Sequence, residues 1–183
     1  MSILMCLILA CIAIGIFAVY NTYVIGKFGV PSSLSVSYYL WNGLRSHLGY
    51  IFTCMMFAVS MLLMPAWLEI TEVISSWSHN LTVLPFFGAA MIAFVGAAPA
   101  FRSCVLESKV HTISATAAAV FSLLWCAVVC YKLAWIILPL SLGIVWGIAF
   151  LTKTQKTASV YWWEMVAFLA TFATIVTECM ILL

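Results

Sequence analysis

Long uncharged stretches dominate this sequence and decide its class. A helix crosses a hydrocarbon core of about 30 Å with about 20 apolar residues. Runs of that length between the charged residues predict six transmembrane helices, at 3–23, 47–68, 81–101, 110–131, 133–151 and 160–183. The runs are continuous, whereas the strands of a membrane barrel alternate polar and apolar residues. We therefore expect an all-α polytopic membrane protein, a six-transmembrane-helix bundle that forms a single domain over residues 1–183.

The composition agrees with a membrane location. The chain is 67% hydrophobic and 7% charged, whereas roughly a quarter of the residues in soluble domains are charged. Its few basic residues are scattered, so the sequence gives no support for nucleic-acid binding and we expect no nucleic-acid partner. The first run could instead be a signal peptide, but it has no basic leader and its apolar stretch is too long, so we expect it to remain. The second run is expected to end at the corner formed by Pro65, Ala66 and Trp67.

Lys and Arg lie mainly in alternate loops. The loops after the first, third and fifth runs hold six of the seven: Lys27, Arg45, Arg102, Lys109, Lys153 and Lys156. The remaining one, Lys132, follows the fourth run. Because cytoplasmic loops are enriched in these residues, this distribution predicts that the odd-numbered loops are cytoplasmic and that both termini lie outside.

One loop, from residue 26 to residue 46, is long enough to contain a further helix. Pro31 followed by two serines is a helix-start signal. The larger side chains then recur at helical spacing, at Leu34, Tyr38, Trp41 and Arg45. This pattern predicts an interfacial helix between the first two spans, with Tyr38, Tyr39 and Trp41 as anchors in the headgroup layer. The alternative is that the second transmembrane helix simply begins early.

Small residues recur every fourth position in two neighbouring runs. The stripes are Ala89, Ala93 and Ala97 in the third run and Ser114, Ala118 and Ser122 in the fourth. Lipid offers no hydrophobic drive for helix association, so small residues matter because they let two backbones approach. We expect the third and fourth helices to form a tight hairpin, with the charged residues between them marking the turn.

Polar side chains at the predicted cytoplasmic ends form the first candidate site. Glu107 and His111 are four residues apart, so they share a face if the fourth helix starts early. Together with His47, Arg102 and Glu164 they could form a basic pocket for an anionic headgroup or phosphate. The alternative is that these residues are ordinary flanks of membrane spans. Glu164 is the most informative of them, because an acid within a span is costly unless it is near the interface or paired.

The predicted outer side carries a second candidate group, an acidic cluster. Glu69, Glu72 and Glu178 could together attract a cation, although exposed carboxylates are usually only solvated. Six of the seven cysteines lie in apolar runs and are expected to act as small apolar residues. Cys126 and Cys130 share a helix face but have no histidine nearby, so they predict no metal site. No catalytic motif appears, and we expect no cofactor.

Two resemblances involve short motifs. The segments "FVGAAPAF" and "KVHTISA" are similar in outline to the ceramidase and adiponectin-receptor group of membrane hydrolases. That group uses three histidines, an aspartate and a serine around zinc. This chain has no aspartate, and its histidines, at 47, 79 and 111, fall on both predicted sides of the membrane. The resemblance therefore does not imply a zinc centre in this chain.

The second resemblance extends over most of the chain. "YVIGKFGVPSSLSVSYYLWN", "LLMPAWLEI" and "YWWEMVAF" resemble short multi-pass membrane proteins of unassigned role found in gut bacteria and their phages. This resemblance implies a bacterial-type inner membrane and no particular activity.

Three functions remain open from the sequence. The first is a non-enzymatic bundle that binds membrane lipids or partner helices, with homo-oligomers as one form. The second is a small transporter or channel with a cytoplasmic polar site near Glu164 and His111. The third is a zinc-dependent lipid hydrolase, for which no ligand set is evident.

Overall fold

The computed structural model describes residues 1–75, 79–97 and 106–183, the side chains of 79 and 106–109 excepted. Its helices are α1 (Ile3–Phe28), α2 (Val36–Leu44), α3 (Tyr50–Ile74), the short 3₁₀-helix η1 (His79–Thr82), α4 (Val83–Ala97), α5 (Leu106–Val128), α6 (Tyr131–Leu151) and α7 (Ser159–Leu182). Within the described residues, six helices are long and apolar enough to cross a membrane. The predicted all-α polytopic bundle is confirmed.

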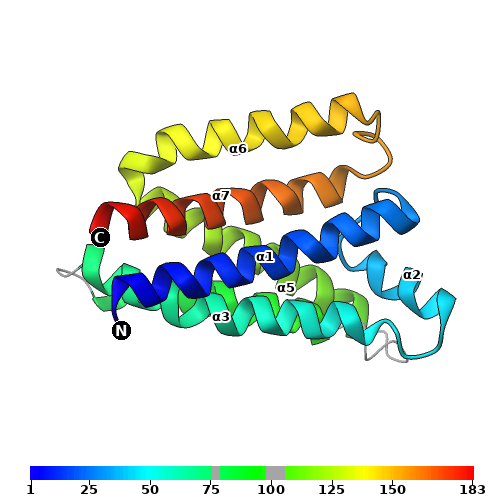
Figure 1. Cartoon of the computed structure of the whole chain (residues 1–183), viewed down its shortest axis with the longest axis horizontal. Helices are drawn as coiled ribbons and strands as arrows, with labels where there is room; N and C mark the ends of the chain where they lie inside the picture. Colours follow the sequence, from blue (N-terminus) through cyan, green and yellow to red (C-terminus); the bar gives the residue numbers. More distant parts are fainter. Residues whose placement is uncertain (76–78, 98–105) are drawn as a thin grey trace.

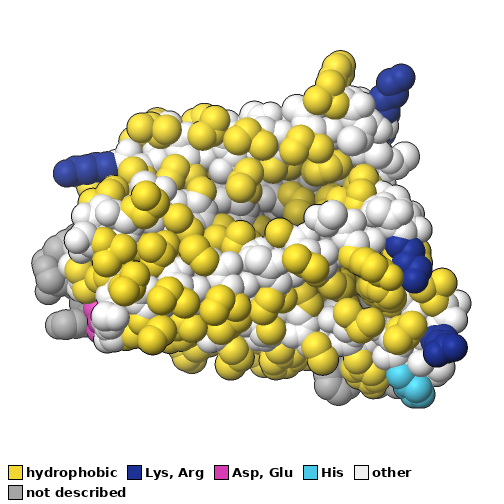
Figure 2. Space-filling view, in the orientation of Figure 1, with side chains coloured by type: hydrophobic (Ala, Val, Ile, Leu, Met, Phe, Trp, Pro, Cys, Tyr) yellow, Lys and Arg dark blue, Asp and Glu magenta, His cyan; other side chains and the backbone are white. Residues whose placement is uncertain are grey.

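The long helices lie side by side with both chain termini at one end (Figure 1). We call this the terminal end, and the opposite end, which holds α2, the α2 end. On the face shown in Figure 2, the charged side chains lie at these two ends, and the surface between them is largely hydrophobic. Such a surface is soluble in a lipid layer but not in water, because a soluble domain spreads polar groups over its whole surface.

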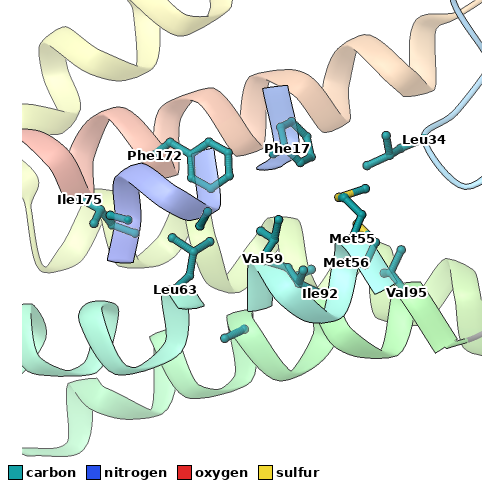
Figure 3. Close-up of a cluster of buried hydrophobic side chains, with 14 of the residues drawn as sticks. Phe17, Leu34, Met55, Met56, Val59, Leu63, Ile92, Val95, Phe172 and Ile175 are labelled. Carbon is teal, nitrogen blue, oxygen red and sulfur yellow. The ribbon is translucent and has the colours of Figure 1, made fainter. Parts of the chain in front are cut away.

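Five of the long helices close into a ring. Contacts run from α1 to α3, from α3 to α4, from α4 to α5, from α5 to α7 and from α7 back to α1. Helix α6 stands outside this ring and packs mainly against α7, as its separate position in Figure 1 shows. Phe17, Met56, Ile92 and Phe172 come from four different helices and point into the common interior (Figure 3).

The predicted hairpin of small residues is confirmed by helices α4 and α5, which form the most extensive helix pair. Ala89, Ala93 and Ala118 are all buried. Polar bonds join α4 to α3 as well, since the Ser60 hydroxyl donates to the Ala89 carbonyl at 2.6 Å and the Thr53 hydroxyl donates to the Gly96 carbonyl at 2.8 Å. Side-chain hydrogen bonds of this kind hold helices together where no water competes.

Helix α3 continues through Pro65 to Ile74, so the expectation that the span ends at this corner was wrong. Pro removes one backbone hydrogen bond, but neighbouring helices compensate for that loss in membrane proteins. The turns beyond Pro65 are held by α5, because the Trp125 Nε1–H donates to the Thr71 hydroxyl at 2.8 Å. The rings of Trp67 and Trp125 also meet edge to face at 5.4 Å.

The short helix predicted after Pro31 is confirmed as α2, a separate element that ends at Leu44, six residues before α3 begins. The alternative, an early start of the second span, is therefore wrong. Two of the three expected anchors, Tyr38 and Trp41, are largely buried, with 6% and 7% of their surface exposed. Trp41 stacks on Tyr23 of α1 at 5.4 Å, and anchoring of these rings in the headgroup layer stays a prediction.

Candidate functional site

A narrow slot lies inside the ring, between α3, α4, α5 and α7, with a volume of about 50 Å³. The side of the slot formed by α7 is one helical stripe, consisting of Glu164, Ala167, Phe168, Thr171 and Phe172. Eight residues of helix rise about 12 Å, so the slot runs along about that length of the bundle. Apart from Glu164, Ser122 and Thr171, its lining is apolar.

Small side chains on α5 create the slot. Ala115, Ala118 and Ala119 form the part of the lining that belongs to α5, and Met56 and Leu63 belong to α3. A methyl group at these positions leaves open a space that a leucine would fill, because protein interiors otherwise pack to the density of organic crystals. The stripe that draws α4 and α5 together therefore borders the slot as well.

Glu164 lies at the α2 end of the slot and carries its only charge among the described lining residues. Its Oε2 accepts a hydrogen bond from the backbone N–H of Leu34 at 2.7 Å. Nearby, the Tyr161 N–H donates to the Ser32 carbonyl at 3.1 Å. These two bonds fix the 29–35 loop onto the start of α7 and place Leu34, which is 2% exposed, over the slot.

A polar network ties α7 and α2 to α1 at the same end of the ring. The Tyr161 hydroxyl donates to Asn21 Oδ1 at 3.0 Å, and the Asn21 side-chain amide donates to the Phe17 carbonyl at 2.8 Å. The Tyr20 hydroxyl and the Ser37 hydroxyl lie 2.6 Å apart. The α2 end of the ring is therefore closed by hydrogen bonds among buried side chains, none of which was predicted from the sequence.

Two of the predicted ligand-binding residues belong to this end of the ring. Glu164 lines the slot, and His111 lies on α5 four residues before Ala115, on the same helix face. Helix α5 does start early, at Leu106, so Glu107 falls within it. The side chain of Glu107 and the whole of Arg102 lie outside the described residues.

His47 is not brought to the slot. It lies in the turn between α2 and α3, where its backbone has a φ of 75°. Its exposed ring stacks on Tyr50 at 6.4 Å. Lys153 and Lys156 are exposed in the loop between α6 and α7.

The three carboxylates of the predicted outer cluster lie toward the terminal end, near the ends of α3 and α7. Glu69 binds the Met1 ammonium at 2.8 Å, and this hydrogen bond raises the pKa of the ammonium. Glu72 is exposed. Glu178 lies beside Cys130, where burial and then the Glu178 charge raise the pKa of the thiol. Among the described residues, no three His, Cys, Asp or Glu side chains are grouped so that they could hold a metal ion.

Comparison with models of protein families, with curated proteins and with solved structures finds no match to this chain. The six apolar helices indicate a multi-pass integral membrane protein. Its function has to be inferred from the slot, the residues around it and the surface of the bundle, because no relative contributes an activity.

Proposed function

We propose that this chain is a non-enzymatic lipid-binding membrane protein. In this proposal the slot takes part of an unbranched alkyl chain, and a hydrogen-bond donor of the same lipid lies near Glu164. The observation that carries the proposal is an elongated apolar slot with a single carboxylate at one end.

The shape of the slot favours a chain over a ring. Its volume of about 50 Å³ is several times the ~10–15 Å³ that one water molecule needs. That space is spread along about 12 Å of helix, so it is long and thin. A row of methylene groups is little wider than a row of waters and fits such a space, whereas a ring system would have to displace side chains. Apolar lining residues such as Ala118 and Phe172 offer only dispersion contacts.

The polar end of the slot favours a lipid that carries a donor group. Oε2 of Glu164 accepts one bond, from Leu34. A carboxylate has four lone-pair sites on its two oxygens, so capacity remains for a hydroxyl or ammonium group of a ligand. Glu164 is the sixth residue of α7, about 8 Å from its start, which is the depth at which lipid headgroups meet the chains.

The sidedness of the membrane is part of the same proposal. The α2 end carries Lys27, Arg45, Lys153 and Lys156, and the terminal end carries Lys132. By the rule that cytoplasmic loops are rich in Lys and Arg, the α2 end faces the cytoplasm of a bacterial-type inner membrane. Glu164 would then contact lipids of the cytoplasmic leaflet.

Native mass spectrometry of the purified protein tests the proposal. A lipid adduct should survive mild detergent removal from the wild type and be lost from Ala118→Leu and Ala119→Leu, which fill the slot. Ala117→Leu is the matched control, since Ala117 is on the same helix but does not line the slot. Glu164→Gln should shift the adducts toward lipids without a cationic headgroup. Equal adduct levels in the wild type, Ala118→Leu and Ala119→Leu would contradict the proposal.

A small transporter is the second candidate, favoured by one observation. Glu164 has no cationic partner among the described residues, in which the recorded ion pair joins Met1 and Glu69. Intramembrane acids often carry protons or bind cations. If transport is the function, proteoliposomes should show a proton or cation flux that Glu164→Gln abolishes and Ala118→Leu reduces. A flux that Glu164→Gln leaves unchanged would exclude this route.

A further inference from the structure

A second apolar concavity, which we call the groove, lies on the outside of the ring between α1 and α3, with α2 at one end. It is lined by Ile12, Gly15, Ile16, Val19, Tyr20, Tyr23, Trp41, Ile51 and Met55. It has a volume of about 560 Å³ and shares no lining residue with the slot. Its floor includes Gly15, where a side chain would meet nothing within 4 Å. Its walls include Val19, Ile51 and Met55. From Ile12 to Tyr23 it follows α1 for about 16 Å, close to half of the hydrocarbon thickness of about 30 Å.

Aromatic rings and a lysine form the upper end of this groove. Tyr23 of α1 and Trp41 of α2 both line it, and their rings stack at 5.4 Å with an angle of 8° between the planes. Lys27, one turn beyond Tyr23, holds its Nζ 5.3 Å from the Trp41 ring centre and 5.6 Å from that of Tyr23. The ring of Phe28 lies 5.8 Å from the same atom. Three rings thus hold one ammonium group at the groove's mouth.

The Lys27 ammonium at the mouth of the groove forms no ion pair with a carboxylate of the described residues. Its side chain is exposed. Cation–π contacts with the ring faces leave the ammonium donors that point away from the rings available to a negatively charged group. Arg45 follows one turn after Trp41 and is also exposed. Several Lys and Arg side chains lie at this end of the molecule, at the right of Figure 2, next to a hydrophobic flank.

We propose that the groove is a binding site for one phospholipid with an anionic headgroup. An acyl chain would lie along α1 over Gly15, and the phosphate would bind the Lys27 ammonium above the paired rings of Tyr23 and Trp41. The complementary charge selects an anionic lipid, because juxtamembrane lysines attract anionic headgroups. The groove selects a lipid over a soluble phosphate, because a soluble phosphate leaves the apolar part empty.

Lipid titrations read by native mass spectrometry test this site. The wild type should bind phosphatidylglycerol more tightly than phosphatidylcholine of equal chain length. Lys27→Gln should lower that preference about fivefold, the effect of one lysine near an anionic lipid. Lys153→Gln, an exposed lysine at the same end, should not lower it. Gly15→Leu should remove one bound phosphatidylglycerol, because Gly15 lines the groove. Gly143→Leu is the matched control and should not, because it also has open space around the added side chain but does not line the groove.

The proposal is overturned if Lys27→Gln keeps the preference, if Lys153→Gln lowers it equally, or if Gly15→Leu binds as many lipids as the wild type. Displacement of the lipid by glycerol phosphate would mean that a soluble phosphate ester suffices, and would also overturn it. The result of this test does not depend on whether the slot binds a lipid. Ala118→Leu reports on the slot alone, and the ratio between the two headgroups reports on the groove.

Discussion

The Glu164 carboxylate accepts a hydrogen bond from the backbone N–H of Leu34 at 2.7 Å, across 130 positions of the chain. The bond joins a span to a loop that belongs to a different part of the sequence. It gives Glu164 a structural role beside its place at the end of the slot, and the two roles respond differently to substitution.

Glu164→Gln and Glu164→Leu should separate these roles. Glutamine keeps an acceptor for the Leu34 N–H, so its melting temperature in detergent should stay near that of the wild type. Leucine leaves that N–H unpaired, which should lower the unfolding free energy by about 1–3 kcal/mol. Val160→Leu, at a residue 56% exposed one turn earlier, is the control. If leucine at 164 were as stable as glutamine, the bond to the loop would have no structural value.

The Trp125–Thr71 bond should hold the end of α3 beyond Pro65. Trp125→Phe removes the Nε1 donor, and Thr71→Val removes its acceptor. Each change should lower stability, and a double-mutant cycle should give a coupling of about 0.5–1.5 kcal/mol. Chemical unfolding of the four proteins measures this. Strictly additive effects would show that α3 continues past Pro65 without help from this bond.

Gly88→Ala should be destabilising because α3 and α4 are too close for a methyl group there. An added Cβ would lie 2.7 Å from a ring carbon of Trp67, whose side chain is fully buried. Overpacking of this kind costs about 1–3 kcal/mol. Gly147→Ala on α6 is the matched control, because nothing lies within 4 Å of the added group. In thermal unfolding, the melting temperature of Gly88→Ala should be well below that of Gly147→Ala. Equal melting temperatures would contradict the close approach of α3 and α4 at Gly88.

The proposed sidedness can be checked with reporters. A tag placed after Leu183 should be digested by protease added to intact cells, since both ends of the chain lie at the terminal end. A reporter inserted near Gln155, in the loop at the α2 end, should be protected. The reverse pattern would place Lys27 and Glu164 toward the outer leaflet.

The spans and the short helix α2 could be predicted from sequence, because apolar run length and the helix-start signal at Pro31 are local properties. The continuation of α3 past Pro65 could not, since it depends on Trp125, more than fifty residues away. The slot could not be predicted either. The sequence predicts only a helix-packing role for Ala118, and the positions of α3 and α7 are needed to show that the same row of small residues borders an open space. His47 and Glu164 are both predicted on the cytoplasmic side of the membrane. The side of the membrane does not determine whether a side chain faces the interior of the helix bundle or its outer surface.

The ring of helices has a consequence for biogenesis. Spans leave the ribosome in order, so α1, α3, α4 and α5 enter the bilayer while the gap between α5 and α1 is still open. Helix α6 does not fill that gap, because it packs outside against α7. The ring is complete only when α7 inserts, so a molecule held inside must be captured by that event or enter later between two helices of the ring.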